Sequence, residues 1–518
     1  MRRLDRAFDR LASRGRRSDP DVVIDRLEAR LAGEPTVVVM KGGLDMDKKE
    51  PRVTPRRGLL IAATAMGVGL LIALPLIFLR GGEEITVATT TVPDVTTTLP
   101  PETTTTIGPD AVLTWSRLAD TTGALSGGER ETIVRPDGWE TFAVRTGYVN
   151  QVIAGGPGLV AVGSANWCQG CWSNYFVQEL IGWDHAGEWT NRKGGAAWLS
   201  EDGETWTQVP ESMFGPGVAM LTGVADNGSR LVAVGIMGGA LPDMTPHGRA
   251  AVWVSDDDGA SWTRVPDDES AFGGEGQHLM WSVIATDSGF VAAGNDLWTS
   301  PDGWVWNRVG PMGQVRRIVR TDDGYVAVGL ISHSAAVWIS ADALSWTPVA
   351  VAAIPVAAPE EVWSAAIDAV AGPDGVVAVG QAQTTTDSST VNDSDGAVWV
   401  ANEEGEWSRV QGDSDVFLSA RHQEIRGVAL AGDRLVAVGT QRPSRFTTTD
   451  AHTPDVRFGP AVSWVSSDGG RTWVRVEAEA LGPRGADVSM TAVATLDGKV
   501  VAFGNDGADL AVWIGTWR

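Results

Sequence analysis

The chain has little cysteine, little tyrosine and, over most of its length, little positive charge. Its 518 residues include 2 Cys and 3 Tyr, and Asp plus Glu outnumber Lys plus Arg by 65 to 41. Two cysteines exclude a disulfide-rich scaffold and a zinc site built from several cysteines. The net charge of −24 argues against nucleic acid as the main partner, because phosphate binding requires a basic surface. A hydrophobic content of 43% excludes wholesale disorder.

The charge changes sign at an apolar segment. Residues 1–57 hold 15 Lys and Arg against 10 Asp and Glu, a net +5, so the remaining 26 and 55 give −29. Residues 58–79 (GLLIAATAMGVGLLIALPLIFL) carry no charge, and a helix of this length spans about 33 Å, enough to cross a bilayer. We predict a transmembrane helix that acts as an uncleaved signal anchor, the alternative being a buried core helix. The basic residues before it place the N-terminus in the cytoplasm.

The segments on either side have simple compositions. Residues 1–57 predict a basic cytoplasmic tail with two short helical stretches, which sets the topology or binds anionic lipid or a cytoplasmic partner. Residues 80–110 predict an extended linker, because their Thr and Pro cannot bury a core. We therefore expect a single-pass protein of the cell membrane whose residues 111–518 lie outside the cytoplasm.

Trp and Gly are abundant, with 23 and 62 residues, and they recur periodically. A segment of the type Leu-Val-Ala-Val-Gly occurs seven times, ending at Gly163, Gly235, Gly294, Gly329, Gly380, Gly439 and Gly504. Each copy follows an apolar strand and a turn, and six copies precede a pair of Trp residues that flank a second turn. Each unit thus predicts four short strands, and radial repetition of such units is typical of a β-propeller.

The seventh unit ends after its third strand, which contains Trp513. Residues 112–118, with Trp115, resemble the fourth strands of the other units. We therefore predict an all-β, seven-bladed propeller over 111–518, in which 112–118 completes blade seven and removes an open sheet edge. A solenoid is the alternative, but it would not explain the split unit. The sequence does not indicate whether residues 119–148 pack on the propeller or form a separate flap.

The turn between paired Trp residues carries a recognisable motif. Ser255 to Trp262 and Ser466 to Trp473 fit S-x-D-x-G-x-[ST]-W, and weaker copies occur in three other units. The pattern resembles the Asp-box, or BNR repeat, of sialidase-like β-propellers. Asp can accept backbone N–H bonds inside such a turn. We interpret the motif aspartates as structural: Asp202, Asp257, Asp302, Asp342 and Asp468.

The resemblance implies either a binding module or an enzyme. Sialidases also carry an Arg-Ile-Pro motif, three arginines for the substrate carboxylate, and a Tyr nucleophile with a Glu partner. This sequence lacks Arg-Ile-Pro and has only Tyr148, Tyr175 and Tyr325. Many Asp-box propellers are non-catalytic. We therefore expect a non-catalytic binding or scaffold module for a protein or glycan, with no catalytic residue assigned. The alternatives are a sialidase-like glycoside hydrolase and an envelope sensor that signals through the cytoplasmic tail.

The first candidate binding place is the entrance of the central channel. Aligning the first strands of the units makes seven residues equivalent: Asn150, Thr222, Trp281, Arg316, Ile367, Arg426 and Thr491. Arg317 and Asp368 follow one residue deeper. We expect Trp281, together with Arg316, Arg317 and Arg426, to bind an anionic or sugar ligand, because Arg pairs bidentately with carboxylates. The alternative is that these arginines pair with local acids.

The second candidate is the long loop at 164–195. Trp167 and Trp172 form either a platform for a partner or glycan, or a small core of the loop itself. Cys168 and Cys171 predict a local disulfide outside the membrane, with a redox role as the alternative. All 6 His fall on the same face as this loop, without a spacing typical of metal ligands. We expect no metal and no cofactor.

Overall fold

The computed structural model describes residues 108, 111–125, 129–134, 140–169, 194–215, 218–237, 249–274, 276–349, 361–385, 392–401, 405–410, 416–417, 422–442, 460–476, 478–482, 488–507 and 509–518. These belong to one compact unit, Thr97–Arg518. The predicted tail and the predicted span at 58–79 lie outside the described residues, so both stay predictions. Within the described ranges, no helix is long and apolar enough to cross a membrane.

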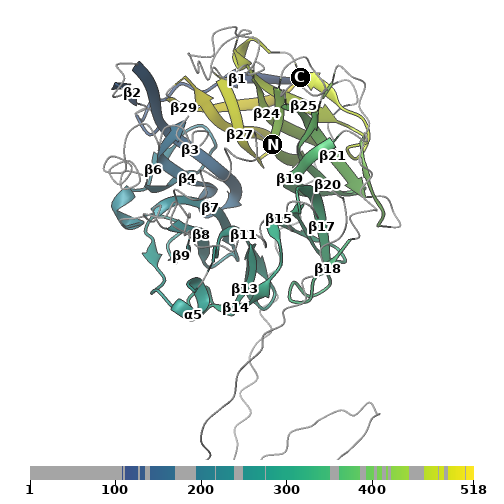
Figure 1. The fold of residues 1–518 in the computed structure, drawn as a ribbon. Helices are drawn as coiled ribbons and strands as arrows, with labels where there is room; N and C mark the ends of the chain where they lie inside the picture. Colours follow the sequence, from purple (N-terminus) through teal and green to yellow (C-terminus); the bar gives the residue numbers. More distant parts are fainter. Residues whose placement is uncertain are drawn as a thin grey trace, which may run out of the picture. The chain divides into compact units, whose positions relative to one another are not determined.

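Seven sheets are arranged around a central axis (Figure 1), which confirms the all-β, seven-bladed propeller. Blade 1 contains β2 (Glu129–Val134), β3 (Glu140–Gly155), β4 (Gly158–Gln169), β5 (Gly195–Ser200) and β6 (Thr207–Gln208). Blade 2 contains β7 (Val218–Asp226), β8 (Leu231–Met237), β9 (Arg249–Ser255) and β10 (Thr263–Arg264). Blade 3 contains β11 (Met280–Thr286), β12 (Gly289–Gly294), β13 (Asp296–Ser300) and β14 (Asn307–Pro311). Blade 4 contains β15 (Gln314–Thr321), β16 (Gly324–Ile331), β17 (Ser334–Ser340) and β18 (Thr347–Pro348).

The last three blades complete the ring. Blade 5 contains β19 (Glu361–Gly372), β20 (Gly375–Thr385), β21 (Asn392–Ala401) and β22 (Trp407–Arg409). Blade 6 contains β23 (His422–Ala431), β24 (Arg434–Arg442), β25 (Ala461–Ser466) and β26 (Val474–Val476). Blade 7 contains β27 (Val488–Leu496), β28 (Lys499–Asp506), β29 (Asp509–Trp517) and β1 (Leu113–Arg117). Short helical turns, η1 (Glu211–Met213), α5 (Glu269–Phe272) and η3 (Glu479–Leu481), follow the outer strands of blades 1, 2 and 6.

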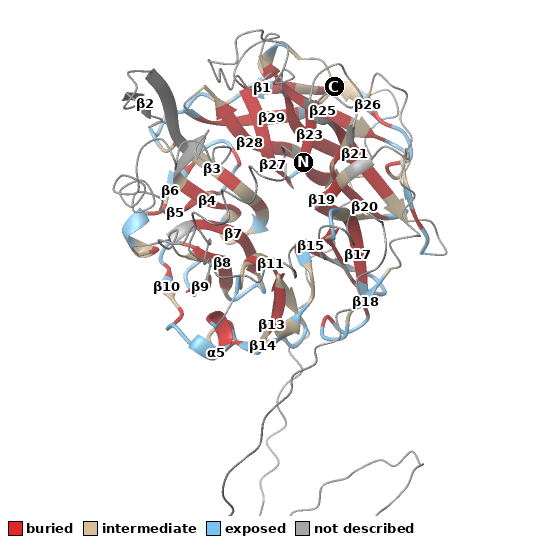
Figure 2. Cartoon of the chain, viewed as in Figure 1, coloured by how far each residue is buried: buried red, intermediate tan, exposed pale blue. Residues whose placement is uncertain are grey.

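The core lies between the blades, so both faces of each middle strand are buried (Figure 2). In β4, Val160 packs in a cluster with blade 2, whereas the next residue, Ala161, packs in a cluster with blade 7. Successive side chains of a strand point to opposite faces. A middle strand covered on both faces is therefore continuously apolar, which accounts for the repeated Leu-Val-Ala-Val segment.

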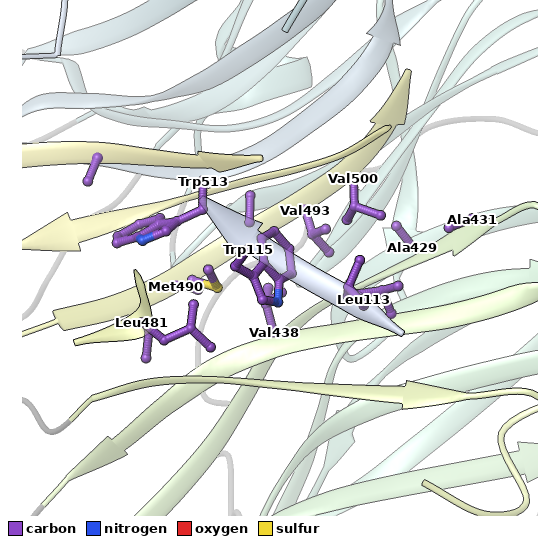
Figure 3. Close-up of a cluster of buried hydrophobic side chains, with 14 of the residues drawn as sticks. Leu113, Trp115, Ala429, Ala431, Val438, Leu481, Met490, Val493, Val500 and Trp513 are labelled. Carbon is purple, nitrogen blue, oxygen red and sulfur yellow. The ribbon is translucent and has the colours of Figure 1, made fainter. Parts of the chain in front are cut away.

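The two ends of the chain meet in blade 7. β1 pairs antiparallel with β29, from Leu113 opposite Trp517 to Arg117 opposite Trp513. The indole of Trp115 donates a 2.8 Å hydrogen bond to the Ser463 hydroxyl of blade 6. Figure 3 shows Leu113 and Trp115 among apolar side chains of the neighbouring strands. β1 thus occupies the place expected for residues 112–118 and closes the ring without a covalent bond.

Blade 1 contains a hairpin that lies outside the four-strand repeat. The first half of β3 pairs with β2, from Glu140 opposite Val134 to Arg145 opposite Glu129. The end of β4 pairs with the same half, with Trp167 opposite Thr146. The hairpin therefore continues the sheet of blade 1 as part of the propeller domain.

Candidate functional site

Every innermost strand carries a β-bulge at the same position. In blade 1 the register with β4 runs from Val149 opposite Gly163 to Gln151 opposite Val162, so Asn150 has no partner residue. The same shift occurs in the other six blades. The seven bulged residues are those that the sequence alignment placed at the channel entrance: Asn150, Thr222, Trp281, Arg316, Ile367, Arg426 and Thr491. A bulge re-aims the side chain that it carries, which makes this ring the candidate site.

The glycine that ends each Leu-Val-Ala-Val-Gly segment makes room for the bulge. A Cβ on Gly504 would lie 1.7 Å from the carbonyl oxygen of Ser489, and one on Gly294 would lie 1.7 Å from that of Leu279. At the other five glycines the corresponding carbonyl would lie between 1.8 and 2.4 Å away. Each carbonyl belongs to the residue two positions before the bulge. The glycine thus recurs because no side chain fits there.

Three of the bulged residues connect neighbouring blades. The Thr491 hydroxyl donates to Val149 O at 2.8 Å, and the Thr222 hydroxyl donates to Met280 O at 2.7 Å. The Asn150 amide donates to Leu221 O at 2.7 Å. In each case the acceptor directly precedes the bulge of the next blade. In blades 7, 1 and 2 the ring position is therefore a structural link.

Blades 3 to 6 place other residue types at the ring position, among them Trp281 and Arg316. The guanidinium of Arg316 lies 4.2 Å from the centre of the Trp281 ring, a cation–π contact between adjacent blades. Arg316 has no carboxylate or hydrogen-bond partner in the part of the chain that the structure describes. Burial, together with the smaller effect of the cation of Arg426, lowers the pKa of Arg316 to about 10. Arg316 is therefore a half-buried cation that has no counterion among the described residues.

Arg426, in contrast, is paired. Its Nε donates to Glu424 Oε2 at 2.8 Å, and Glu424 is 4% exposed. Burial opposes the charge of Arg426, but Glu424 and, less strongly, Tyr148 outweigh burial and hold the pKa of Arg426 above its ordinary value. Glu424 and Arg426 both belong to β23 of blade 6, whereas Tyr148 belongs to β3 of blade 1.

Sequence reasoning assigned no role to Glu424 and none to Tyr148. Both stand two residues before a bulge, so the carbonyl of Tyr148 faces Gly163 and that of Glu424 faces Gly439. An ionisable residue at that repeat position is the signal that could have identified them.

Arg317 is also paired, one residue deeper than Arg316. Its Nε donates to Asp368 Oδ1 at 2.6 Å, and Asp368 Oδ2 accepts the backbone N–H of Val428 at 3.0 Å. Asp368 thus joins blades 4, 5 and 6. The alternative that the arginines pair with local acids holds for Arg317 and Arg426, and it does not hold for Arg316. A cavity of about 180 Å³, lined in part by Arg317 and Asp368, lies between the innermost strands.

The Asp-box aspartates accept hydrogen bonds from their own turns. In blade 2, Asp257 accepts from the Ser261 hydroxyl at 2.6 Å and from the Ser261 N–H at 2.8 Å. These bonds, the hydroxyl first, lower the pKa of Asp257. The second Trp of the motif bonds back into the turn, as Trp473 does to Gly470 O at 2.8 Å. Asp202, Asp302, Asp342 and Asp468 make equivalent contacts.

The long loop of blade 1 is only partly described. Trp167 and Cys168 lie in β4, and the positions of their side chains are not described. Trp172 and Cys171 lie outside the described residues, so the ligand platform and the disulfide stay predictions. No group of three or more His, Cys, Asp and Glu residues in the described ranges is placed to hold a metal ion.

The comparisons with known proteins find similarity in structure alone. No family model and no curated protein matches the chain. A Dyadobacter fermentans protein of unknown function is 14% identical, with 72% of this chain and 95% of that chain covered and a TM-score of 0.38. Trypanosoma rangeli sialidase in complex with sialic acid is 11% identical, with 78% and 58% covered and a TM-score of 0.36. A glycosyl hydrolase from Bacteroides ovatus is 12% identical, with 77% and 92% covered and a TM-score of 0.32. The chain is therefore distantly similar in structure to sialidases and to glycoside hydrolases, and it spans about three fifths of the sialidase.

Proposed function

We propose that the propeller is a non-catalytic binding or scaffold module. The entrance of its central channel, which the ring of bulged residues surrounds and which we call the mouth, receives a carboxylate of a glycan or of a protein partner. One observation carries the proposal: Arg316 is stacked on Trp281 and has no acidic partner among the described residues. A desolvated cation without a counterion is costly, and a bound anion removes that cost. The indole face fixes the plane of the guanidinium, whose parallel N–H groups match the two oxygens of a carboxylate.

A difference between the two halves of the ring also supports Trp281 and Arg316 as the binding site. Thr491, Asn150 and Thr222 use their side chains to connect blades, whereas Trp281 and Arg316 make no such bond among the described residues. A repeat protein can form a binding site where a few repeats carry, at an otherwise structural position, side chains that are available to a ligand.

The test is a glycan array on the full chain, with carboxylated and neutral glycans side by side. We expect carboxylated glycans to bind, Arg316→Met to weaken binding at least tenfold and Trp281→Ala to weaken it about threefold to tenfold. Arg320→Met is the control, because Arg320 lies on the same strand, β15, is exposed and pairs with Asp287 on the surface. Equal binding by wild type and Arg316→Met would exclude the mouth as the binding site.

A glycoside hydrolase of the sialidase kind is the second candidate. It is favoured by Tyr148 and Glu424, which both raise the pKa of Arg426, since a Tyr nucleophile with a Glu partner is the catalytic pair of sialidases. A fluorogenic sialoside is the probe. Turnover that Tyr148→Phe abolishes and Arg320→Met leaves intact would establish the enzyme, and carboxylate binding without turnover would establish the non-catalytic module.

A further inference from the structure

We infer that the mouth admits one negative charge and rejects a second, and that Glu424 and Asp368 are the specificity-determining residues that set this limit. The inference rests on the proposed function, because it concerns the same mouth. It names the ligand class as a singly charged oxyanion, such as a monocarboxylate, and excludes dicarboxylates and phosphate dianions.

The charged side chains described at the mouth carry one more positive charge than negative charge. Arg317 is neutralised by Asp368, with 2.6 Å between Nε and Oδ1. Arg426 is neutralised by Glu424. Arg316, stacked on Trp281, has no acid beside it in the described part of the chain. Among these described residues, three cations and two anions leave one positive charge for a ligand to satisfy.

Both acids are buried and held in place, so their charges act on whatever enters. Glu424 is 4% exposed and Asp368 is 8% exposed, which leaves little water or salt to screen them. Asp368 uses one oxygen for Arg317 and the other for the Val428 N–H. Once a first carboxylate has neutralised Arg316, a second one finds Arg317 and Arg426 already paired with Asp368 and Glu424. It would lose its hydration without gaining a cation, which is strongly disfavoured.

Glu424 is the better residue to test, because Asp368 also has a structural role. Asp368 links Arg317 of blade 4 to the backbone N–H of Val428 in blade 6, so a substitution at Asp368 would alter the spacing of the ring residues. Glu424 pairs with Arg426 inside one strand, β23. In Glu424→Gln the amide oxygen can still accept from Arg426, while the charge is removed.

The experiment uses two sugar acids that differ only at one end. D-gluconate carries one carboxylate and D-glucarate carries two, on the same six-carbon chain. Titration calorimetry on the full chain measures the affinity for each. We expect wild type to bind gluconate at least tenfold more tightly than glucarate, and Glu424→Gln to reduce that preference about tenfold by strengthening the binding of glucarate. The control is Glu204→Gln, which removes the same charge at an exposed Asp-box turn where Glu204 pairs with Lys499.

Each other outcome overturns a specific statement. Equal affinities in wild type, or an unchanged preference in Glu424→Gln, would overturn the charge limit. Loss of gluconate binding in a Glu424→Gln protein that melts like wild type would make Glu424 a positioning residue for Arg426 instead. If Glu204→Gln shifted the preference as much, overall charge and not the mouth would be responsible. Undiminished gluconate binding by Arg316→Met would refute the proposed site itself, and absence of binding by either acid would refute both proposals.

Discussion

At each repeat, a small residue faces a large one. The Ala of the Leu-Val-Ala-Val-Gly segment stands directly opposite the first Trp of the blade, as Ala161 does to Trp198 and Ala502 to Trp513. The same pairing holds in the other five blades. Protein interiors are close-packed, so an indole on one strand requires a small neighbour on the next. The repeated Ala and Trp are therefore explained by the packing of Trp between the sheets.

The Asp-box aspartates lead to a prediction about acid stability. Burial alone would raise the pKa of Asp468, but bonds from the Thr472 hydroxyl, at 2.6 Å, the Thr472 N–H and the Ser466 hydroxyl lower it overall. We expect Asp468→Ala to lower the free energy of unfolding by about 1–2 kcal/mol at pH 7, the scale of a lost turn-capping side chain. Because the folded pKa lies below the unfolded one, this contribution is complete above about pH 4 and disappears as the pH falls through the folded pKa.

Urea denaturation between pH 7 and pH 3 measures this effect. The difference between wild type and Asp468→Ala should shrink towards acid pH. Asp322→Ala is the control, because Asp322 is exposed in a hairpin and its side chain makes no hydrogen bond to any described residue, so its effect should stay within about 0.5 kcal/mol. A difference that stays constant with pH would show that the Asp468 carboxylate charge contributes nothing.

At the scale of elements, the bulge is the feature that turns a strand into part of a site. It depends on an absent side chain in the neighbouring strand, since a Cβ at Gly504 would lie 1.7 Å from the Ser489 carbonyl oxygen. We expect Gly504→Ala to lower the free energy of unfolding by about 3 kcal/mol, because β27 must shift or lose the bulge. Thermal or urea unfolding measures the loss.

Gly372→Ala is the matched control at the end of β19. The nearest atom to a Cβ there is 3.6 Å away and the backbone does not need a positive φ. Such a substitution is expected to be neutral or to stabilise by about 0.5 kcal/mol, through the unfolded chain. Similar effects of the two substitutions would mean that the glycine opposite the bulge is not required.

The blades and the ring positions were predictable from the sequence, whereas the bulges, the extra hairpin and the side-chain pairings were not. Counting Leu-Val-Ala-Val-Gly segments was enough to predict the blades and the ring positions, because equivalent residues in a repeat have equivalent places. The bulge itself was not predicted, since a glycine after a strand is typical of an ordinary turn. The β2–β3 hairpin occurs only in blade 1. The pairing of Arg426 with Glu424 depends on how the bulge turns the two side chains of β23, and an alignment of repeats does not contain that information.

At the scale of the whole molecule, the chain joins the propeller away from the mouth. The guanidinium of Arg434 donates to the Ala111 carbonyl at 2.7 Å, and Leu113 pairs with Trp517 at the end of the last strand. That end of β29 corresponds to the Asp-box turns of the other blades, whereas the bulges lie at the opposite ends of the sheets. Residues 108 and 111 therefore leave the mouth accessible to a ligand.

Closure by β1 makes blade 7 the place where the ring should open first. Trp115 is 7% exposed, bonds to Ser463 and packs in the cluster of Figure 3, yet its strand is held to β29 only by non-covalent contacts. We expect Trp115→Ala to cost about 3–5 kcal/mol and to release β1 before the other strands unfold. The amide protons of β29 that face β1 should then exchange faster than those of the other six blades, as native-state hydrogen exchange can measure.

Trp206→Ala is the matched control for this prediction. Trp206 occupies the corresponding position in blade 1 and is 1% exposed, but a covalent turn joins its strand to β5. Its loss should lower global stability by a similar amount and leave the exchange of β29 at the global rate. If amide exchange were uniform across the blades in both variants, blade 7 would be closed as firmly as the blades that are formed from one continuous segment. The ring would then unfold as one unit, without opening first between β1 and β29.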